Sequence, residues 1–198
     1  MGLALKDTRH HCYGDYLTWP EDSRYELIDG HAYAMSPAPD LAHQDVAGEI
    51  YLQTRLALRQ QACRAFIAPV DVRLPERDEA DERIDCVVQP DVLVVCDPAK
   101  LDRRGVRGAP DWIVEVLSPS TAGHDQILKR DLYERHGVRE YWLVHPVDRI
   151  VSIYRWLDGA YGKPEIHELQ GETRVGVLPE VIIRWDDLVE RLPNDYVA

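Results

Sequence analysis

The pattern of apolar and polar positions along this chain predicts strands separated by helices. Two nearly continuous apolar runs, Val87 to Cys96 and Trp112 to Leu117, are typical of strands buried on both faces of a helix-covered sheet. A further strand is expected over Phe66 to Leu74. Two more are predicted over Glu140 to His145 and Ile150 to Trp156, and the short turn between them indicates a hairpin.

The N-terminal part of the chain predicts a short helix followed by a hairpin. A helix capped by Asp7 or Thr8 is expected to end at Leu17. After it, an Asp-Gly pair separates two short runs, Arg24 to Ile28 and His31 to Met35. Asp-Gly tolerates the positive φ of a type I′ turn, so the two runs are predicted to pair as antiparallel strands.

Two longer helices are predicted in the rest of the chain. The first runs from about Leu41 to Ala62, where apolar residues recur at helical spacing and neither Gly nor Pro follows Gly48. The second runs from about Ala122 to His136, with an N-cap supplied by Ser118-Pro119-Ser120-Thr121 and a C-terminal boundary at Gly137.

The order of these elements predicts an α/β fold. Pro75 to Asp85 is charged and indicates a loop or flap, and the tail after about residue 165 is less regular. A helix, a hairpin, a long helix, strands, a helix and more strands together predict a mixed central sheet flanked by helices. The 198 residues fit a single domain, which we assign to residues 1–198.

Composition narrows the class of protein. Hydrophobic residues make up 45% of the chain and charged residues 29%, as in ordinary globular proteins. No apolar run approaches the ~20 residues of a membrane span, and Met1 to Lys6 lacks the layout of a secretory signal. The 4 cysteines are scattered without a Cys-x-x-Cys pair, so neither a zinc site nor a disulfide framework is indicated. We therefore expect a cytoplasmic protein with no membrane partner.

The charge balance limits how the chain could bind nucleic acid. A net charge of −12 does not favour a protein that coats nucleic acid non-specifically, because phosphate binding draws on Lys and Arg. Local docking through a bound metal ion and a few basic residues remains open. Lys100, Arg103, Arg104 and Arg107 form the one notable basic cluster of the sequence, and a solvated linker is the simpler interpretation of it.

Two carboxylates stand at the most apolar parts of the chain. Asp91 follows Pro90 at the start of one apolar run, and Glu115 lies inside another. A buried acid takes up a proton or finds a partner, and two acids on neighbouring strands can hold a divalent metal ion. The alternatives are a backbone N–H as the partner of Asp91 and a structural ion pair of Glu115 with Arg107 or Arg139.

Lys129 and Glu26 are the other candidate site residues. Lys129 lies on the helix that follows Glu115, where it could orient a water or stabilise charge on a phosphate, or simply pair with Asp125 one turn earlier. Glu26 in the first hairpin strand could add a third acid or only a cross-strand contact. His43 at the start of the long helix could be a ligand, a base or, as the safer interpretation, a polar N-terminal residue.

Several motifs together resemble a known family. They are Tyr25-Glu26-Leu27-Ile28-Asp29-Gly30, Ser36-Pro37, His43, Gln89-Pro90-Asp91-Val92-Leu93-Val94-Val95, Gly108-Ala109-Pro110-Asp111, Val114-Glu115-Val116-Leu117-Ser118-Pro119-Ser120-Thr121, Lys129 through Tyr133 and Gly137-Val138-Arg139-Glu140-Tyr141-Trp142. From about Thr18 to Trp156 the chain resembles the Uma-type endonuclease family. The combined motif is specific and covers most of the chain.

This resemblance implies a restriction-endonuclease-like fold of the PD-(D/E)XK superfamily. It places the metal-binding acids on Asp91 and Glu115 and the superfamily's helix-borne acid on Glu26. The superfamily lysine usually stands two residues after the second acid, which is Leu117 here, so the chain is similar to members whose lysine has moved to the next helix, at Lys129. Members commonly carry an acid after the Asp-Gly turn, where this chain has His31.

Three hypotheses about function follow from these residues. The first is an endonuclease that hydrolyses DNA with Mg²⁺ or Mn²⁺ held by Asp91 and Glu115, with Glu26 and Lys129 as further catalytic residues. The second is a catalytically silent homodimeric binding or regulatory module on the same fold. The third is a hydrolase of a small phosphorylated compound. A homodimer is expected in either of the first two cases, and Trp142 and Trp156 are candidates for its face or for the core.

Overall fold

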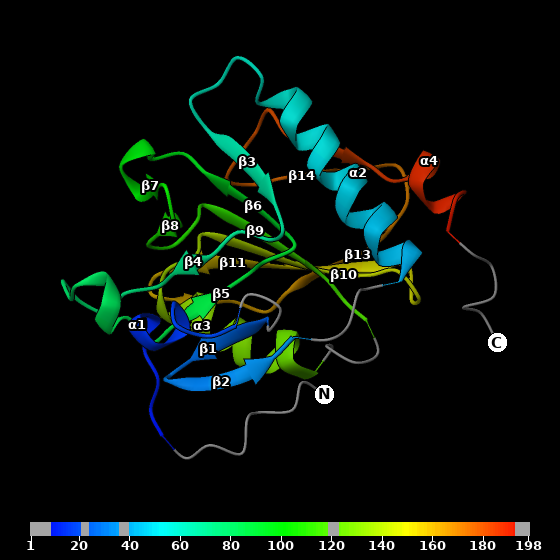
Figure 1. Cartoon of the computed structure of the whole chain (residues 1–198). Coiled ribbons are helices and arrows are strands. Elements are labelled where there is room, and N and C mark those ends of the chain that lie inside the picture. The colour runs from blue at the N-terminus through cyan, green and yellow to red at the C-terminus, as the bar shows by residue number, and fades with distance from the viewer. Residues whose placement is uncertain (1–8, 21–23, 36–39, 119–122, 193–198) are drawn as a thin grey trace.

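A computed structural model of the chain describes residues 9–20, 24–35, 40–118 and 123–192 (Figure 1). The helices are α1 (Tyr13–Tyr16), α2 (Leu41–Ala57), a π-helix η3 (His124–Lys129), α3 (Arg130–Arg135) and α4 (Asp186–Val189), with 3-10 turns η1 (Asp81–Arg83) and η2 (Pro98–Lys100). The strands are β1 (Tyr25–Ile28), β2 (His31–Ala34), β3 (Arg64–Ile67), β4 (Val72–Arg73), β5 (Val87–Val88), β6 (Val92–Val95), β7 (Leu101–Asp102), β8 (Gly105–Arg107), β9 (Trp112–Val116), β10 (Glu140–His145), β11 (Ile150–Leu157), β12 (Ala160–Tyr161), β13 (Glu165–Glu168), β14 (Glu172–Arg174) and β15 (Ile182–Arg184).

The strands form mixed sheets, as the sequence predicts. The central sheet has the order β12-β11-β10-β9-β6-β3, with β13 paired to β11. In it β9 and β10 are parallel, and β9 is antiparallel to β6. A second sheet has the order β2-β1-β5-β4-β8-β7, and β14 pairs with β15. The predicted mixed α/β fold is therefore confirmed.

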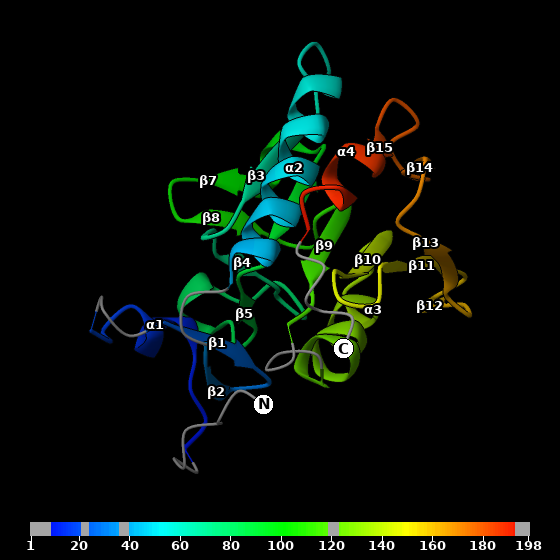
Figure 2. The ribbon, with the colours of Figure 1, turned by 90° about the vertical axis from the view of Figure 1, so that its right-hand side faces the viewer.

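Helices cover both faces of the central sheet. Figure 2 shows α2 and α4 on one side of β9 and β10, and α3 on the other side. Side chains alternate between the two faces of a strand, and the core divides accordingly. Trp112, Val114 and Val116 of β9 pack in the cluster with α2, whereas Ile113 packs in the cluster with Leu132 of α3. Glu115 has the same parity as Ile113, so its side chain lies on the α3 face.

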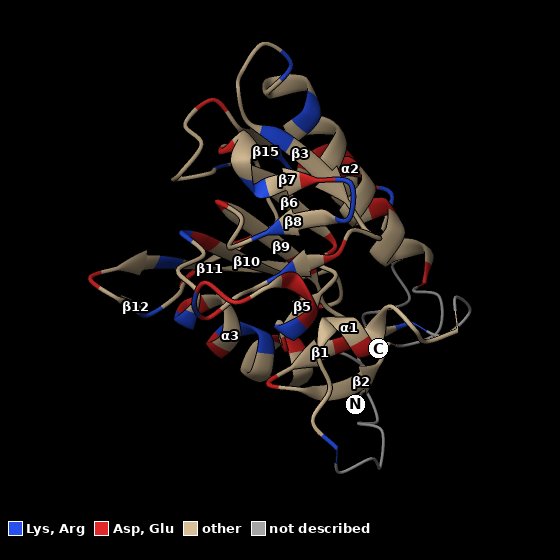
Figure 3. Ribbon diagram, turned by 60° about the vertical axis from the view of Figure 1, so that its left-hand side comes forward, with Lys and Arg blue, Asp and Glu red and all other residues tan. Residues whose placement is uncertain are grey.

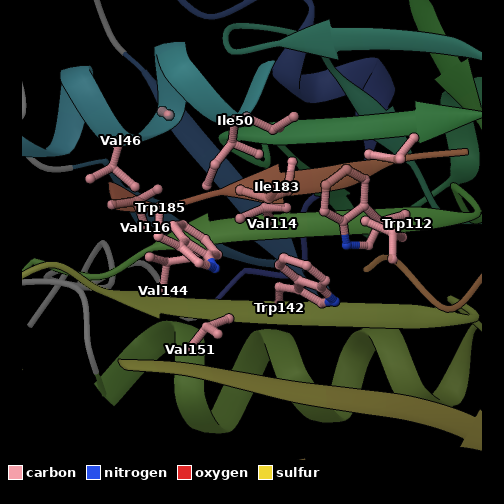
Figure 4. Packing of buried hydrophobic residues seen from close by; sticks show 14 of the residues in the cluster. Val46, Ile50, Trp112, Val114, Val116, Trp142, Val144, Val151, Ile183 and Trp185 are labelled. Carbon is pink, nitrogen blue, oxygen red and sulfur yellow. The ribbon is translucent and has the colours of Figure 1, made fainter. Parts of the chain in front are cut away.

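The larger core cluster lies between α2, the central sheet and the C-terminal segment. Val46 and Ile50 of α2 are fully buried against β9 and β10 (Figure 4). The rings of Trp112 and Trp142 meet edge to face, with centroids 5.1 Å apart. Trp142 is completely buried, so it belongs to the core and not to a dimer face. Trp156 is 36% exposed, so the core interpretation does not hold for it.

Two strands that the sequence predicts as continuous are divided between sheets. The predicted strand Phe66 to Leu74 forms β3 in the central sheet and β4 in the second sheet. Likewise, Val87 to Cys96 forms β5 in the second sheet and β6 in the central sheet. Proline cannot donate to a strand ladder, and Pro69 and Pro90 stand at the two divisions. The divisions place the Gln89–Asp91 segment where the two sheets meet.

The predicted helices shift at their ends. The long helix stops at Ala57 instead of Ala62, because the chain turns there to enter β3. The N-terminal helix is confined to α1, and its predicted caps Asp7 and Thr8 lie outside the described residues. The predicted N-cap segment 118–121 also lies outside them, apart from Ser118. Gly137 adopts φ 74°, which suits the predicted helix boundary.

The loop between the two acid-bearing strands is more ordered than the sequence predicts. It contains the antiparallel hairpin β7–β8, in which Leu101 pairs with Val106 and Asp102 with Gly105. The strand β8 also pairs in parallel with β4. The basic residues Arg103 and Arg104 therefore form the tip of a hairpin and are not part of a solvated linker.

One prediction about the cysteines is wrong. Cys63 and Cys96 form a disulfide. Arg64 pairs with Val95 in the antiparallel β3–β6 ladder, so Cys63 and Cys96 are the next cross-strand neighbours. A separation of 33 residues hid this pairing in the sequence. In the described part of the chain, no helix has the length and apolar character needed to cross a membrane.

Candidate active site

Four elements bring charged side chains together around Glu115 of the central sheet. Asp91 directly precedes β6, Glu115 lies in β9, Glu26 lies in β1, and Lys129 ends the π-helix η3. All four were expected to form one site, and the fold makes them neighbours. Glu26 belongs to a strand and not to a helix, so the helix-borne position implied by the resemblance is wrong for it.

Lys129 is at the centre of this cluster. Its ammonium Nζ lies 2.9 Å from Oε1 of Glu26 and 3.0 Å from Oε1 of Glu115. Asp125 Oδ1 lies 3.5 Å from the same nitrogen, and the side chain of Lys129 is only 5% exposed. The pair of Asp125 with Lys129 is therefore buried, and the alternative of a surface pair on the helix is wrong.

Glu115 is held by donors from three directions. The Tyr133 hydroxyl donates to Oε1 at 2.8 Å, and Lys129 donates to the same oxygen. The backbone N–H of Asp91 points to Oε2 over a longer distance of 3.4 Å. Neither Arg107 nor Arg139 is a partner of Glu115, because their guanidinium groups pair with Asp81 and Asp111.

Asp91 lies beside Glu115 and is partly accessible. Its Oδ2 accepts the backbone N–H of Val116 at 2.8 Å and lies 3.1 Å from Nε2 of His43. The Asp91 side chain is 20% exposed, against 3% for Glu115. Asp91 thus has the backbone partner that the sequence allowed, together with a histidine partner that makes His43 more than a polar residue at a helix start.

Glu26 links the hairpin to the rest of the cluster. Its Oε1 accepts the backbone N–H of Gln89 at 2.8 Å, and its Oε2 lies 3.3 Å from Nε2 of His124. Glu26 is paired across the hairpin with Tyr33, and the Tyr33 ring packs on His124 with centroids 5.0 Å apart. The side chain of Glu26 therefore lies in the acid cluster, and its cross-strand neighbour Tyr33 contacts His124, which in turn approaches Glu26.

The protonation states of Glu26 and Lys129 follow from their surroundings. Burial alone would raise the pKa of Glu26, but the charge of Lys129 and hydrogen bonds from His124 and Gln89 lower it to about 2. Burial would lower the pKa of Lys129, yet the charges of Glu115, Glu26 and Asp125 raise it well above its usual value. Lys129 is therefore a permanent cation at this site.

Glu115 behaves in the opposite way. Burial raises its pKa well above the ordinary value, and the negative charges of Asp125, Asp91 and Glu26 add to the effect against the opposing charge of Lys129. Burial lowers the pKa of His43, but the hydrogen bond and charge of Asp91 outweigh it and raise the pKa. The site holds more acid than its bases neutralise.

This surplus of acid suits a divalent cation. Within the described residues, no group of three or more His, Cys, Asp or Glu side chains is arranged to hold a metal ion. Mg²⁺, however, keeps several waters and is commonly bound by one or two carboxylates together with substrate phosphates. Asp91 and Glu115 are two carboxylates that could serve as such oxygen ligands. Oδ1 of Asp91 has no hydrogen bond within the described part of the chain, and Oε2 of Glu115 has only the long contact with Asp91.

Sequence reasoning missed three residues of this cluster. Gln89 and Tyr133 stood only inside longer motifs, and His124 was not considered. Their signal was present, since Gln89 lies two residues before Asp91 and Tyr133 lies one helical turn after Lys129. His31 takes no part in the cluster, because it is exposed and its ring lies 3.0 Å from the Asp29 carbonyl.

Comparisons with known proteins found a family model and a relative that each match most of the chain. The model of the Uma2 family, described as "Putative restriction endonuclease", matches residues 13–185. The protein named "Uncharacterized protein slr1290", from Synechocystis, is 30% identical over 145 residues, which are 71% of each chain.

A solved structure has a similar fold. It is the crystal structure of "a putative nuclease belonging to DUF820" from Anabaena variabilis, which superposes with a TM-score of 0.70 at 22% sequence identity. The similarity covers 90% of this chain and 97% of the other one. At this level of identity the match establishes the fold and leaves the chemistry to be argued from the residues of the site.

Proposed function

Since the chain belongs to the Uma2 family, we propose that it is an endonuclease that hydrolyses DNA phosphodiester bonds with a divalent metal ion, Mg²⁺ or Mn²⁺. The family and the fold support a nuclease-type function, but they do not specify the metal ion or DNA as the substrate. The observation that supports the finer proposal is the contact of the buried Lys129 ammonium with Glu26 and Glu115, beside the partly exposed Asp91.

Asp91 and Glu115 would hold the metal ion. When bound there, the ion would polarise the scissile phosphate and lower the pKa of a bound water. The protein contributes the orientation of these two carboxylates. Hydrogen bonds from Val116 and His43 fix Asp91, and hydrogen bonds from Tyr133 and Lys129 fix Glu115. Fixed ligands of this kind need no reorganisation during the reaction.

Lys129 acts as a cation and a hydrogen-bond donor, not as a base. Its raised pKa keeps the proton on Nζ, so this group can orient a water by donation or stabilise negative charge that develops on the phosphate. Glu26 and Asp125 keep the ammonium in position. Glu26 is thereby a positioning residue for Lys129.

Nicking of supercoiled plasmid DNA in the presence of Mn²⁺ tests this proposal. We expect nicking by the native protein, no nicking in excess EDTA, and a loss of at least about 100-fold in Asp91→Ala and Lys129→Ala. Lys163→Ala is the matched control, because Lys163 is exposed and lies between β12 and β13, and it should nick at the native rate.

Two results would contradict the proposal. Native-like nicking by Asp91→Ala would remove the proposed metal ligand from the reaction. Faster cleavage of a small phosphodiester than of DNA would instead favour a hydrolase of small phosphorylated compounds, which an acidic protein could bind without neutralising a polyanion.

A non-catalytic module on the same fold is the second candidate function. One observation favours it: Lys129 already has three carboxylate partners, so the cluster has a structural role without any metal ion. A folded protein that binds no divalent ion at millimolar concentration would support this second function over the first.

A further inference from the structure

A pocket lies beside the proposed active site and takes no part in the chemistry described above. It has a volume of about 480 Å³, within the range of about 300–1,000 Å³ that is usual for small-molecule sites. Its walls come from β3, the Pro69–Asp71 segment, Gln89 and the β7–β8 hairpin. The lining residues that matter here are Arg64, Phe66, Asp71, Gln89, Arg103 and Arg104.

Three arginines of this pocket have spare positive charge. Neither Arg64 nor Arg103 forms an ion pair with any residue that the structure describes. Among the described residues, the Arg104 guanidinium has a single ion-pair contact, a long one of 3.5 Å to Glu82, and both side chains of that pair are about half exposed. Figure 3 shows basic residues on β3 and at the turn between β7 and β8. In a chain with a net charge of −12, such a concentration of unneutralised guanidinium groups indicates an anionic ligand.

The acids that line the pocket are already engaged. Asp102 pairs with the buried Arg73 at 2.6 Å. Asp71 Oδ1 accepts the Tyr16 hydroxyl at 3.1 Å and the Gln89 amide at 2.8 Å. Asp102 also accepts the backbone N–H of Arg104 at 2.7 Å, but Arg73 balances its charge. Asp71 is then the one lining carboxylate without a cationic partner among the described residues, so three arginines leave the pocket with a net positive charge.

One wall of the pocket suits a planar ring. Phe66 lies beside Leu101 and Val106, and the Arg64 guanidinium stands 5.0 Å from the Phe66 ring centroid. Nucleic-acid bases stack on aromatic rings and on arginine planes in proteins that bind unpaired strands. A guanidinium already ordered over an aromatic ring is a preformed surface for such stacking.

Gln89 connects this pocket to the proposed active site. Its side chain lines the pocket, while its backbone N–H donates to Glu26. Asp91 follows two residues later, a span of at most ~7 Å along the chain. Phosphates of one DNA strand recur about every 3.4 Å of helix axis. A strand that passes over Asp91 can therefore place a neighbouring nucleotide in the pocket.

We propose that this pocket binds one nucleotide of the substrate strand, a few positions from the scissile phosphate. Arg103 and Arg104 contact its phosphate, and its base stacks on the Arg64–Phe66 wall. The proposal rests on the proposed function, since it names how the same site would grip a DNA strand.

Binding of a short fluorescent single-stranded oligodeoxynucleotide, measured by anisotropy in EDTA, tests this pocket without any cleavage. We expect Arg103→Ala/Arg104→Ala to weaken binding about tenfold and to reduce the slope of log K against log salt by about 0.7, the value for one phosphate contact on a single strand. Phe66→Leu keeps the apolar volume and should weaken binding roughly fivefold, but should have no effect with an abasic oligonucleotide. Arg184→Ala/Arg191→Ala makes the same change of charge at the C-terminal end and should bind like the native protein.

Three outcomes would overturn the proposal or reassign the pocket. Native-like binding by Arg103→Ala/Arg104→Ala, or no binding by the native protein, would overturn it. Equal competition by a free mononucleotide would assign the pocket to a small molecule instead of a strand. Failure of the proposed catalysis would be seen separately. If nicking is absent, or is unaffected in Asp91→Ala, while oligonucleotide binding still depends on Arg103 and Arg104, the proposed active site is contradicted and the nucleotide pocket is not.

Discussion

Two buried glutamates of one cluster show how position decides chemistry at the scale of a residue. Glu26 contacts Lys129, His124 and a backbone N–H, and its pKa falls to about 2. Glu115 shares Lys129 but is surrounded by three other acids, and burial together with their charge raises its pKa. The same side chain is therefore kept as an anion at one position and driven towards the neutral form at the other.

Replacing Glu115 by glutamine should stabilise the metal-free protein at pH 7. Because the folded pKa of Glu115 is raised, its contribution to stability is present below the unfolded pKa of about 4.5 and is lost as the pH rises through the folded pKa. Glu115→Gln removes this loss, so its free energy of unfolding in urea with EDTA should exceed that of the native protein at pH 7. The exposed Glu172→Gln serves as control. A less stable Glu115→Gln protein would mean that the ion pair with Lys129 is net stabilising.

Glu26 should give the opposite pH dependence. Its folded pKa of about 2 lies below the ordinary 4.5, so its contribution is complete above about pH 4.5 and is lost as the pH falls towards 2. Over that interval the native protein should lose about 3 kcal/mol more unfolding free energy than Glu26→Gln, at 1.36 kcal/mol per pKa unit. Urea titrations at several acidic pH values measure the difference, and parallel curves for the two proteins would refute the assignment.

At this scale the sequence predicted the identity of the acids better than their contacts. Asp91 and Glu115 stood out because acids are costly inside apolar runs. No local pattern showed that His43 approaches Asp91 or that His124 approaches Glu26, since those contacts join residues 48 and 98 positions apart. The roles of the four site residues in a reaction stay predictions.

At the scale of elements, prolines and one glycine determine how the two sheets meet. Pro69 and Pro90 end strand ladders and pass the chain from one sheet to the other. Gly105 adopts φ 118°, and a Cβ built there would lie 2.3 Å from the Asp71 carbonyl oxygen. Apolar runs reveal where strands are but not which sheet they join. The sequence therefore predicted these strands at the right positions, but as continuous strands instead of pairs divided between two sheets.

Gly105→Ala should loosen the β4–β8 contact. The added methyl meets backbone, and alanine is strained at this positive φ, so we expect a loss of at least about 1 kcal/mol in unfolding free energy. Gly162→Ala is the control, because nothing lies within 4 Å of its Cβ position and its φ is not positive. Urea midpoints measure both variants. Equal midpoints would show that the β8 backbone does not approach Asp71 this closely.

At the scale of the whole molecule, the balance of charge opposes binding to DNA. A net charge of −12 repels a polyanion, so any attraction has to be local. The acidic cluster at Asp91 and Glu115 would attract DNA only after a cation has bound, whereas the pocket at Arg103 and Arg104 is basic by itself. The mixed sheet with helices on both faces was predictable from the sequence. A homodimer stays a prediction, now without Trp142 as a contact.

Calorimetric titration with Mn²⁺ near neutral pH tests the central claim most directly, namely that Asp91 and Glu115 together hold a divalent ion. Metal binding needs an ionised ligand, so the raised pKa of Glu115 predicts release of a proton on binding. The measured heat should then vary with the ionisation enthalpy of the buffer, and binding should be lost in Asp91→Asn while Lys163→Ala retains it. Folded native protein that takes up no Mn²⁺ at millimolar concentration, or Asp91→Asn protein that binds it as tightly as the native one, would contradict the claim.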